Sequence, residues 1–422
     1  MYDIIIRNAR IIDGTGAPWY YGDVAVKDGK IARIARNLQA EAETVIDGTG
    51  KVLAPGFIDV HVHLRQPGNT AAETVATGTM AAAAGGFTSI VAMPNTKPAA
   101  DTVGSIELLH RLTAKEAVVR VLPCGCMTVG LAGEEMAPIG SLKSAGVVAL
   151  SDDGKCIQDH ALMRRIVEYA KAFNLPIMDH CEENKLAEGG VMHEGKWSVL
   201  LGINGISSAS EELMVARNII LARQIDWKIH MQHISAAESV ELLRSARSKG
   251  IRVTGEATPH HIALTDECIK SFDTNYKMNP PLRAEEDRLA LIEGVADDTI
   301  TVIATDHAPH SFEEKDQGLA NSAFGIVGLE TSFPICYTTL VRTGRITLDR
   351  LVEMMAINPR VRFGVPFRKN DFTVFDLNDK YIIHPDEFLS KGRATPFENW
   401  EVYGRCLLTV HDGEIVWKAD DV

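Results

Sequence analysis

The sequence has no CxxC pair among its seven cysteines, and that number is odd. Cys124 and Cys126 are separated by a single glycine, a spacing that suits neither a zinc knuckle nor a redox dithiol. We therefore expect buried free thiols rather than a disulfide framework or a cysteine metal site. Free thiols fit a reducing compartment, so we expect the protein to be cytoplasmic.

The chain also lacks an excess of positive charge and a long uninterrupted apolar run. Its 43 basic and 56 acidic side chains give a net charge of -13, which attracts neither nucleic acid nor an anionic membrane. The apolar N-terminal stretch MYDIIIRNARIIDG contains Asp3 and Arg7, so we expect neither a signal peptide nor a membrane span there. A small acidic substrate is still compatible, because it responds to the local field of a pocket.

The two ends of the chain have a similar pattern of short β-rich runs. Residues 1–53 alternate strand-like runs with turn signals, and the pattern returns from residue 368 onward in DFTVFDL and RCLLTVHDGEIVWK. The Asp-Gly pair at 412–413 is typical of a tight hairpin turn. We expect residues 1–53 and 368–422 to pair as one small β-sandwich domain.

The middle of the chain, residues 54–367, alternates apolar strand-like runs with amphipathic helical stretches. Stretches such as HALMRRIVEYAKAFN repeat apolar residues at three- and four-residue spacing. Eight strand-like runs can be counted: GFIDVHVHL, FTSIVAMPN, VVRVLPCGC, GVVALSDDG, PIMDHCE, KIHMQHIS, RVTGEATPHH and TVIATDHAP. Eight such units predict an α/β fold, a TIM-like (β/α)8 barrel, in which chemistry gathers at the C-terminal ends of the strands.

Side chains that can bind metal ions lie at the ends of several of these runs. Side chains alternate along a strand, so His61 and His63 face the same way and can share one ion. A lone histidine at a strand end is usually a surface or hydrogen-bonded residue, but four histidines and two aspartates on five strands are poorly explained by coincidence. Imidazole and carboxylate ligands favour a divalent ion, with zinc the first candidate. The residues concerned are His61, His63, Asp152 or Asp153, His180, His233 and Asp306.

Six protein ligands are more than one ion needs if it keeps an open position for water, so the set predicts two ions close together. A carboxylate after the fourth run could bridge them. Only one of the neighbours Asp152 and Asp153 can face inward, and the pattern alone leaves that choice open.

Seven motifs, in this order along nearly the whole chain, carry a family resemblance: DVHVHLRQPG, AMPNTKP, SDDG, HCEEN, ATPHH, KMNPPLR and ATDHAPH. Together they closely resemble the class I (bacterial-type) dihydroorotases of the amidohydrolase superfamily. The resemblance implies a zinc hydrolase with two ions per subunit. It also implies the reversible hydrolysis of dihydroorotate to N-carbamoyl-aspartate in de novo pyrimidine biosynthesis.

Position by position, the resemblance implies a role for each metal-binding side chain. His61, His63 and Asp306 would hold one ion and His180 and His233 the other, with Asp153 between the two ions. Asp306 would also be the catalytic residue that carries a proton from the attacking water to the leaving nitrogen. Relatives such as the hydantoinases use a carboxylated lysine as the bridge, and Lys155 keeps that alternative open.

Substrate recognition is expected from a second set of residues. Arg65 can meet the substrate carboxylate with two parallel hydrogen bonds, although a salt bridge at the barrel rim is the alternative. For Asn95 and Asn279 the alternative is loop capping. His260 and His261 rank lower: the resemblance makes neither a ligand, and support of the site from behind by one of them is an alternative. With the contacts that the resemblance adds, the expected substrate-binding residues are His63, Arg65, Asn95, Asn279, His310 and the backbone of Phe324 and Gly325.

The resemblance implies a homodimer and, in some relatives, association with aspartate transcarbamoylase. Two other functions are weighed against it. One is a hydantoinase or allantoinase on the same barrel, which Arg65 and Asn95 disfavour because an uncharged ring gives a guanidinium no partner. The other is an inactive scaffold for aspartate transcarbamoylase, which loss of His61 and His63 would mark. Both histidines are present.

Overall fold

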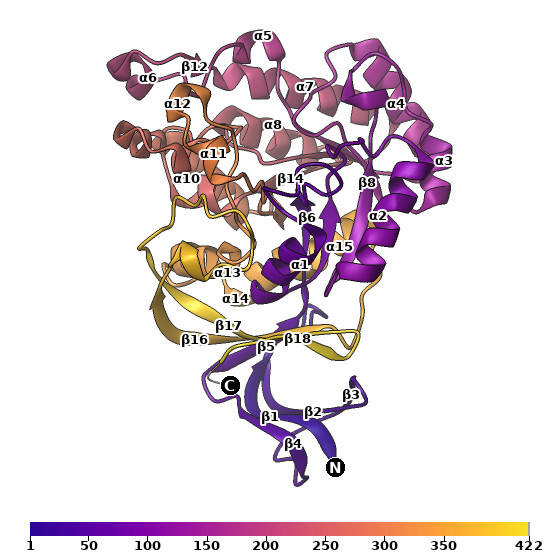
Figure 1. The fold of residues 1–422 in the computed structure, drawn as a ribbon, viewed down its shortest axis with the longest axis vertical. Helices are drawn as coiled ribbons and strands as arrows, with labels where there is room; N and C mark the ends of the chain where they lie inside the picture. The colour runs from indigo at the N-terminus through magenta and orange to yellow at the C-terminus, as the bar shows by residue number, and fades with distance from the viewer. Residues whose placement is uncertain (421–422) are drawn as a thin grey trace.

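The computed structural model describes residues 1–420, which form a large barrel and a separate sheet built from both chain ends (Figure 1). Within this range, no helix is both long enough and apolar enough to cross a membrane. All seven cysteines are free thiols, and six of them are buried, as predicted.

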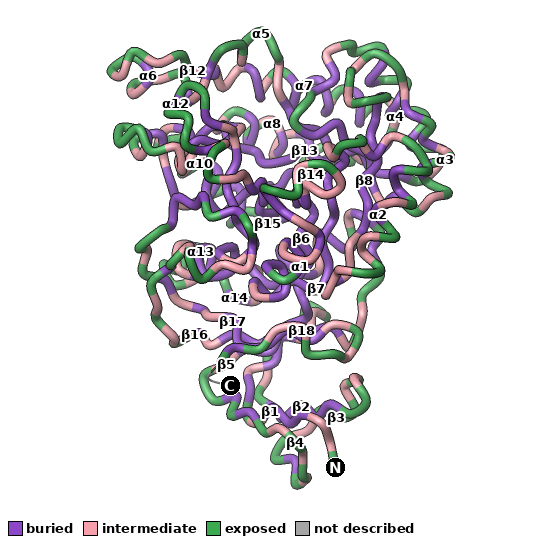
Figure 2. Tube along the Cα trace, in the orientation of Figure 1, coloured by how far each residue is buried: buried purple, intermediate pink, exposed green. Residues whose placement is uncertain are grey.

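Eight parallel strands form the barrel, in the order in which the eight apolar runs occur in the sequence. A bridge between Val62 and His307 joins the segment after the last strand to the first, so the sheet is nearly closed. Figure 2 shows these strands as the buried centre of the molecule. The predicted barrel is therefore confirmed. Its strands are β6 (Phe57–Val62), β7 (Phe87–Ala92), β8 (Arg120–Gly125), β9 (Ala149–Leu150), β10 (Ile177–Asp179), β13 (Ile229–Met231), β14 (Val253–Ala257) and β15 (Val302–Ile303).

Helices surround the barrel because each presents one apolar face to the strands. In α4 (His160–Ala172) the buried residues Leu162, Ile166 and Ala170 recur every four positions, and Asp159 caps the first turn by accepting from two backbone N–H groups. The other long helices are α1 (Val75–Ala84), α2 (Val103–Glu116), α3 (Ile139–Ala145), α7 (Ser208–Ile225), α8 (Ala237–Ser248) and α10 (Glu285–Ala296).

Shorter elements lie in the connections that follow the barrel strands. Between β10 and α7 the chain leaves the barrel to form a two-stranded sheet with two short helices: α5 (Asn184–Ala187), β11 (Met192–His193), α6 (Lys196–Leu201) and β12 (Gly205–Ile206). Later short helices are α9 (Pro259–Ala263), α11 (Phe312–Lys315), α12 (Gly318–Asn321), α13 (Ser332–Cys336), α14 (Leu348–Val352) and α15 (Asn358–Phe363).

The second large sheet combines strands from both chain ends. Their order is β18-β17-β16-β5-β1-β2-β3, and β4 pairs with β1. The hairpins at Asp28-Gly29 and Asp412-Gly413 both turn through positive φ angles, as Asp-Gly hairpins do. The residue boundaries of this unit stay a prediction. The strands are β1 (Tyr2–Ile11), β2 (Tyr20–Lys27), β3 (Lys30–Ala35), β4 (Ala42–Asp47), β5 (Lys51–Pro55), β16 (Phe372–Ile382), β17 (Glu401–His411) and β18 (Glu414–Lys418).

Candidate metal centre and substrate pocket

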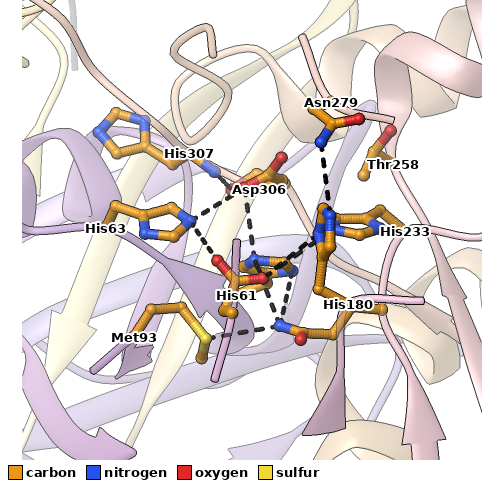
Figure 3. Close-up of polar contacts among 12 residues, drawn as sticks. His61, His63, Met93, His180, His233, Thr258, Asn279, Asp306 and His307 are labelled. Carbon is orange, nitrogen blue, oxygen red and sulfur yellow. Dashed lines mark hydrogen bonds and ion pairs between the residues drawn. The ribbon is translucent and has the colours of Figure 1, made fainter. Parts of the chain in front are cut away.

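The six predicted metal-binding side chains meet at the C-terminal ends of the barrel strands. Figure 3 labels His61, His63, His180, His233 and Asp306 among them. None is more than 8% exposed. Two overlapping groups have ligand atoms within 4.8 Å of one another; they are His61 with His63 and Asp306, and His61 with Asp153 and His233. His180 completes the set, because its Nδ1 lies 2.9 Å from the Nε2 of His233.

Asp153 lies at the centre of this cluster. Its Oδ1 is 3.2 Å from the Nε2 of His61 and its Oδ2 is 3.3 Å from the Nε2 of His63. The neighbouring Asp152 faces away and accepts from the backbone N–H of Met127, and Lys155 is exposed. Of the bridging groups weighed from the sequence, only Asp153 therefore faces the cluster.

Two features of the cluster show that its side chains fit a divalent cation. The Oδ1 of Asp153 is buried and makes no hydrogen bond among the described residues. Buried carboxylate oxygens normally accept a hydrogen bond, and a cation between Asp153 and the Nε2 of His61 would take its place here. The close approach of the ring nitrogens of His180 and His233 is likewise suited to a shared positive centre.

Charges within the cluster shift the pKa values of its members strongly. Against the effect of burial, the positive charges of His61 and His63 hold the pKa of Asp153 well below its ordinary value. Burial, together with the charges of His180 and His61, lowers the pKa of His233 to about 4. Asp153 is therefore charged and His233 neutral near pH 7, the forms in which each side chain binds a metal ion.

Three residues of the site have left-handed backbone conformations, which residues other than glycine rarely adopt. The φ angles are 57° at Arg65, 31° at His233 and 49° at Asp306. Such conformations cost roughly 1 to 3 kcal/mol each and persist only where the surrounding structure holds them. They set the direction in which these side chains leave the strand ends.

A cavity of about 240 Å³ opens next to the cluster and brings together all of the predicted substrate-binding residues. It suits a ligand of one small ring. Larger hollows occur elsewhere, such as one of about 700 Å³ against β16 and β17, but their described walls include none of the six clustered side chains. The 240 Å³ cavity is lined by His63, Arg65, Asn95, Asp153, Gly154, His180, His233, Asn279, Asp306, Ala308, His310, Phe324 and Gly325.

The two asparagines of the cavity are fixed by neighbouring polar groups. Asn95 Oδ1 lies 2.9 Å from the Nδ1 of His63, so it orients that ring. Asn279 donates from Nδ2 to Glu182 Oε2 at 2.7 Å, while its buried Oδ1 has no partner among the described residues. Asn279 Oδ1 is therefore a buried acceptor, in a residue that lines the cavity, which no donor of the described residues satisfies.

The Phe324–Gly325 edge of the cavity is held by two buried lysines. The N–H of Gly325 donates to the carbonyl of Lys277 at 3.1 Å, and its carbonyl accepts from the Nζ of Lys315 at 2.9 Å. A Cβ at Gly325, where φ is 132°, would come within 2.7 Å of the Ala308 carbonyl oxygen, so only glycine fits. A ring amide at this edge would have to share acceptors that already have donors within the chain.

Sequence reasoning missed two glutamates beside the cluster, Glu256, which is buried, and Glu182, which is half-buried. Glu256 in β14 is fully buried, and its Oε1 lies 2.6 Å from the Nδ1 of His61. Glu182 lies 3.7 Å from the Nε2 of His180 and pairs with Asn279. The available signal for Glu256 was a single acidic residue inside an apolar barrel strand, which must have a polar partner.

Among the described residues, neither the His260 ring nor the His261 ring hydrogen-bonds to any of the six clustered side chains. His261 is held by Thr258 Oγ1 at 2.7 Å and by the Pro280 carbonyl at 3.0 Å. The His260 ring is buried against His261, and its Nε2 has no partner among the described residues. Neither ring belongs to the two groups whose ligand atoms cluster together.

Comparison with known proteins gives consistent matches over the chain. The sequence model of the family described as dihydro-orotase-like matches residues 50–239. The dihydroorotase of Bacillus cytotoxicus is 48% identical over 422 residues, covering 99% of this chain and 98% of the relative. That of Bacillus thuringiensis is 47% identical over 404 residues, covering 94% of each chain.

Solved structures give the same fold at lower sequence identity. The L-hydantoinase (dihydropyrimidinase) from Arthrobacter aurescens has a TM-score of 0.88 at 25% identity and covers 99% of this chain and 96% of its own. The dihydropyrimidinase from Brevibacillus agri has a TM-score of 0.85 at 24% identity and covers 99% and 95%. These likenesses confirm a barrel of the amidohydrolase type.

Proposed function

The chain belongs to the dihydroorotase family of cyclic amidohydrolases, and we propose that the cavity at the barrel mouth is the place where it opens and closes the dihydroorotate ring. The reaction is the reversible hydrolysis of the ring amide to give N-carbamoyl-aspartate, a step of de novo pyrimidine biosynthesis. The observation that carries this proposal is the meeting of six buried metal-binding side chains with Arg65 around one small cavity.

The cofactor is proposed to be two zinc ions per subunit. His61, His63 and Asp306 would hold one ion and His180 and His233 the other, with Asp153 between the two ions. The buried Oδ1 of Asp153, which accepts no hydrogen bond among the described residues, supports this arrangement. When bound, the ions supply Lewis acidity and lower the pKa of water so that it can act as a nucleophile near neutral pH.

Asp306 is proposed as the residue that moves the proton. Its Oδ1 lies 3.1 Å from the Nε2 of His63 and 3.4 Å from that of His61, so the carboxylate reaches into the cluster while lining the cavity. The charges of His61 and His63 outweigh burial and keep the pKa of Asp306 low, so it starts the reaction as a base. It takes a proton from the attacking water and delivers it to the ring nitrogen that leaves.

Arg65 is proposed to anchor the substrate carboxylate. Its Nε donates to the Pro309 carbonyl at 3.0 Å, which fixes the plane of the guanidinium beside the cavity. A planar guanidinium can offer a carboxylate two parallel hydrogen bonds. Asn279 Oδ1 is available for a ring N–H, and the other proposed contacts are His63, Asn95, His310, Phe324 and Gly325.

The competing function is hydrolysis of an uncharged cyclic amide, since the structural relatives are hydantoinases. Arg65 argues against it, because a half-buried guanidinium with no carboxylate to meet weakens binding of a neutral ring. The test is formation of N-carbamoyl-aspartate from dihydroorotate by zinc-loaded protein, measured beside hydantoin and dihydrouracil, with the metal content determined on the same sample. Turnover of the neutral rings but not of dihydroorotate would overturn the proposal.

We propose a homodimer in the cytoplasm as the native state, in keeping with the resemblance. Size-exclusion chromatography with light scattering gives the subunit number, and a monomer at micromolar concentration would contradict the dimer. Association with aspartate transcarbamoylase is a further proposal, tested by whether the two enzymes elute together when mixed.

A further inference from the structure

The side chain of Glu256 lies beneath the metal cluster, between two imidazole rings. Its Oε1 is 2.6 Å from the Nδ1 of His61 and its Oε2 is 2.9 Å from the Nε2 of His230. All three side chains are fully buried. The remaining ring nitrogen of His230, Nδ1, lies 2.8 Å from the hydroxyl of Thr254. A chain of four polar groups therefore runs through the barrel interior and ends at His61.

The direction of each hydrogen bond in this chain follows from the chemistry of a carboxylate. An ionised carboxylate can only accept, so the Nδ1 of His61 and the Nε2 of His230 must both carry hydrogen. When a cation displaces the second ring proton, a His61 ring that keeps hydrogen on Nδ1 presents its lone pair on Nε2. That nitrogen is the one that faces Asp153 and Asp306, at 3.2 and 3.4 Å. Glu256 thus selects the tautomer in which His61 can bind a cation.

The same carboxylate also holds the backbone of a second ligand. Glu256 Oε1 accepts from the N–H of His233 at 3.1 Å, at the residue whose φ is 31°. The backbone carbonyl of Glu256 accepts from the N–H of Ile234 at 2.9 Å. Glu256 therefore fixes two successive residues of that segment, His233 and Ile234. Glu256 Oε1 therefore sets both the ring of His61 and the main chain of His233.

A buried carboxylate in this position needs an explanation, because a charge inside a barrel core is costly unless all of its partners are in place. Here three N–H groups meet it, from His61, His230 and His233. Carboxylates behind metal-binding histidines fix ring orientation and increase ligand basicity, and their loss typically weakens metal binding 10- to 100-fold.

We propose that Glu256 is a positioning residue that locks His61 in its metal-binding tautomer and couples it to His233. This inference rests on the metal centre of the proposed function. Glu256 would affect the affinity for the metal ion and would make no direct contact with the substrate. Glu256 is absent from the walls of the 240 Å³ cavity, in agreement with that role.

The test is zinc affinity, measured by competition with a chromophoric chelator, in the full-length Glu256→Gln variant. Glutamine keeps the size but turns one oxygen into an NH2 group, so either His61 or His230 loses its acceptor. We expect zinc affinity to fall about 10- to 100-fold. We also expect the KM for dihydroorotate to stay within about twofold of wild type once zinc is saturating, a split that a merely destabilised fold does not give.

Glu73→Gln is the matched control. Glu73 is also fully buried and its Oε2 lies 3.3 Å from the Nε2 of a histidine, His307, which is not one of the six ligands. The zinc affinity of the Glu73→Gln variant should match that of the wild-type protein. Equal losses of zinc affinity in Glu73→Gln and Glu256→Gln would overturn the inference, because the effect would then belong to any buried glutamate.

A second variant covers the case in which Glu256→Gln does not fold. Glu256→Asp keeps the charge but withdraws the carboxylate by about 1.5 Å, so it can no longer reach both rings. It should also bind zinc more weakly, by at least about tenfold. Wild-type zinc affinity in a folded Glu256 variant would refute the inference alone, whereas a wild-type protein that binds no divalent ion would refute the proposed metal centre.

Discussion

The Nη2 of Arg65 lies 3.2 Å from the Nε2 of His310, so a guanidinium and an imidazole form one wall of the 240 Å³ cavity. The carbonyl of Phe324 lies 2.8 Å from the same His310 nitrogen. Burial and the charge of Arg65 lower the pKa of His310 to about 4, so the imidazole is neutral at physiological pH. The positive charge on this wall therefore comes from Arg65.

Replacing Arg65 with alanine should raise the KM for dihydroorotate at least about 30-fold, which corresponds to the loss of about 2 kcal/mol from a buried charged contact. The KM is measured by steady-state kinetics with dihydroorotate and, in the reverse direction, with N-carbamoyl-aspartate. Arg65→Lys is the comparison: it keeps the charge but offers no planar pair of donors, so we expect an intermediate KM. An unchanged KM in Arg65→Ala would contradict the anchor.

Replacing Asp306 with asparagine should lower kcat by at least about 100-fold, because the amide cannot take up and deliver the proton. The variant is nearly the same size, so the circular dichroism spectrum and the fold should persist. The comparison is made at saturating zinc, so that weaker metal binding does not account for the loss. Normal turnover by a folded Asp306→Asn protein would exclude its role as proton carrier.

Removal of divalent ions with a chelator should abolish activity and lower the thermal unfolding midpoint. The folded state holds the ligands together and the unfolded state does not, so an ion at 100 times its Kd stabilises the fold by about 3 kcal/mol. Adding zinc back should restore both properties. Activity that survives complete removal of metal, confirmed by elemental analysis, would rule out a metal-dependent reaction.

The stability of the protein should depend on pH through Glu330. Burial raises the pKa of Glu330 from 4.5 to about 7, although its carboxylate accepts from the backbone N–H groups of Leu389 and Ser390. The folded protein therefore binds this proton more tightly than the unfolded chain. Its contribution to stability is complete below about pH 4.5 and is lost as the pH rises to about 7.

The Glu330→Gln variant isolates this contribution, because glutamine has no proton to lose. Thermal midpoints of wild type and variant, measured across this pH range, should diverge as the pH rises, with the wild type losing stability more steeply. Parallel curves for the two proteins would show that Glu330 does not titrate in that range.

The barrel could be predicted from the sequence because each strand is a short apolar run followed directly by polar residues. In FIDVHVHL the apolar run ends at His61 and His63, and in TVIATDHAP it ends at Asp306. The residues that mark the end of each strand are therefore also the candidate metal ligands. Parallel strands bring their C-terminal ends to one rim. The position of each residue at a strand end was therefore enough to predict that these side chains lie close together.

What could not be predicted depends on contacts between distant residues. The role of Glu256 arises because the barrel brings its side chain from β14 against His61 of β6, across the intervening β15, and no local pattern encodes that pairing of side chains. The left-handed backbone at Arg65 and Asp306 is likewise held by tertiary contacts rather than by residue type, since neither residue favours positive φ as glycine does.

One strand, β5, links the early and the late parts of the chain. It pairs with β1 on one edge, and on the other edge Pro55 and Leu53 lie opposite Phe372 and Val374 of β16. During synthesis, β5 leaves the ribosome with most of the chain still to be translated, and its open edge must wait for residues that arrive near the end. A nascent chain cut off before β16 would keep that edge unpaired and prone to aggregate, so the final segment completes the fold of the first.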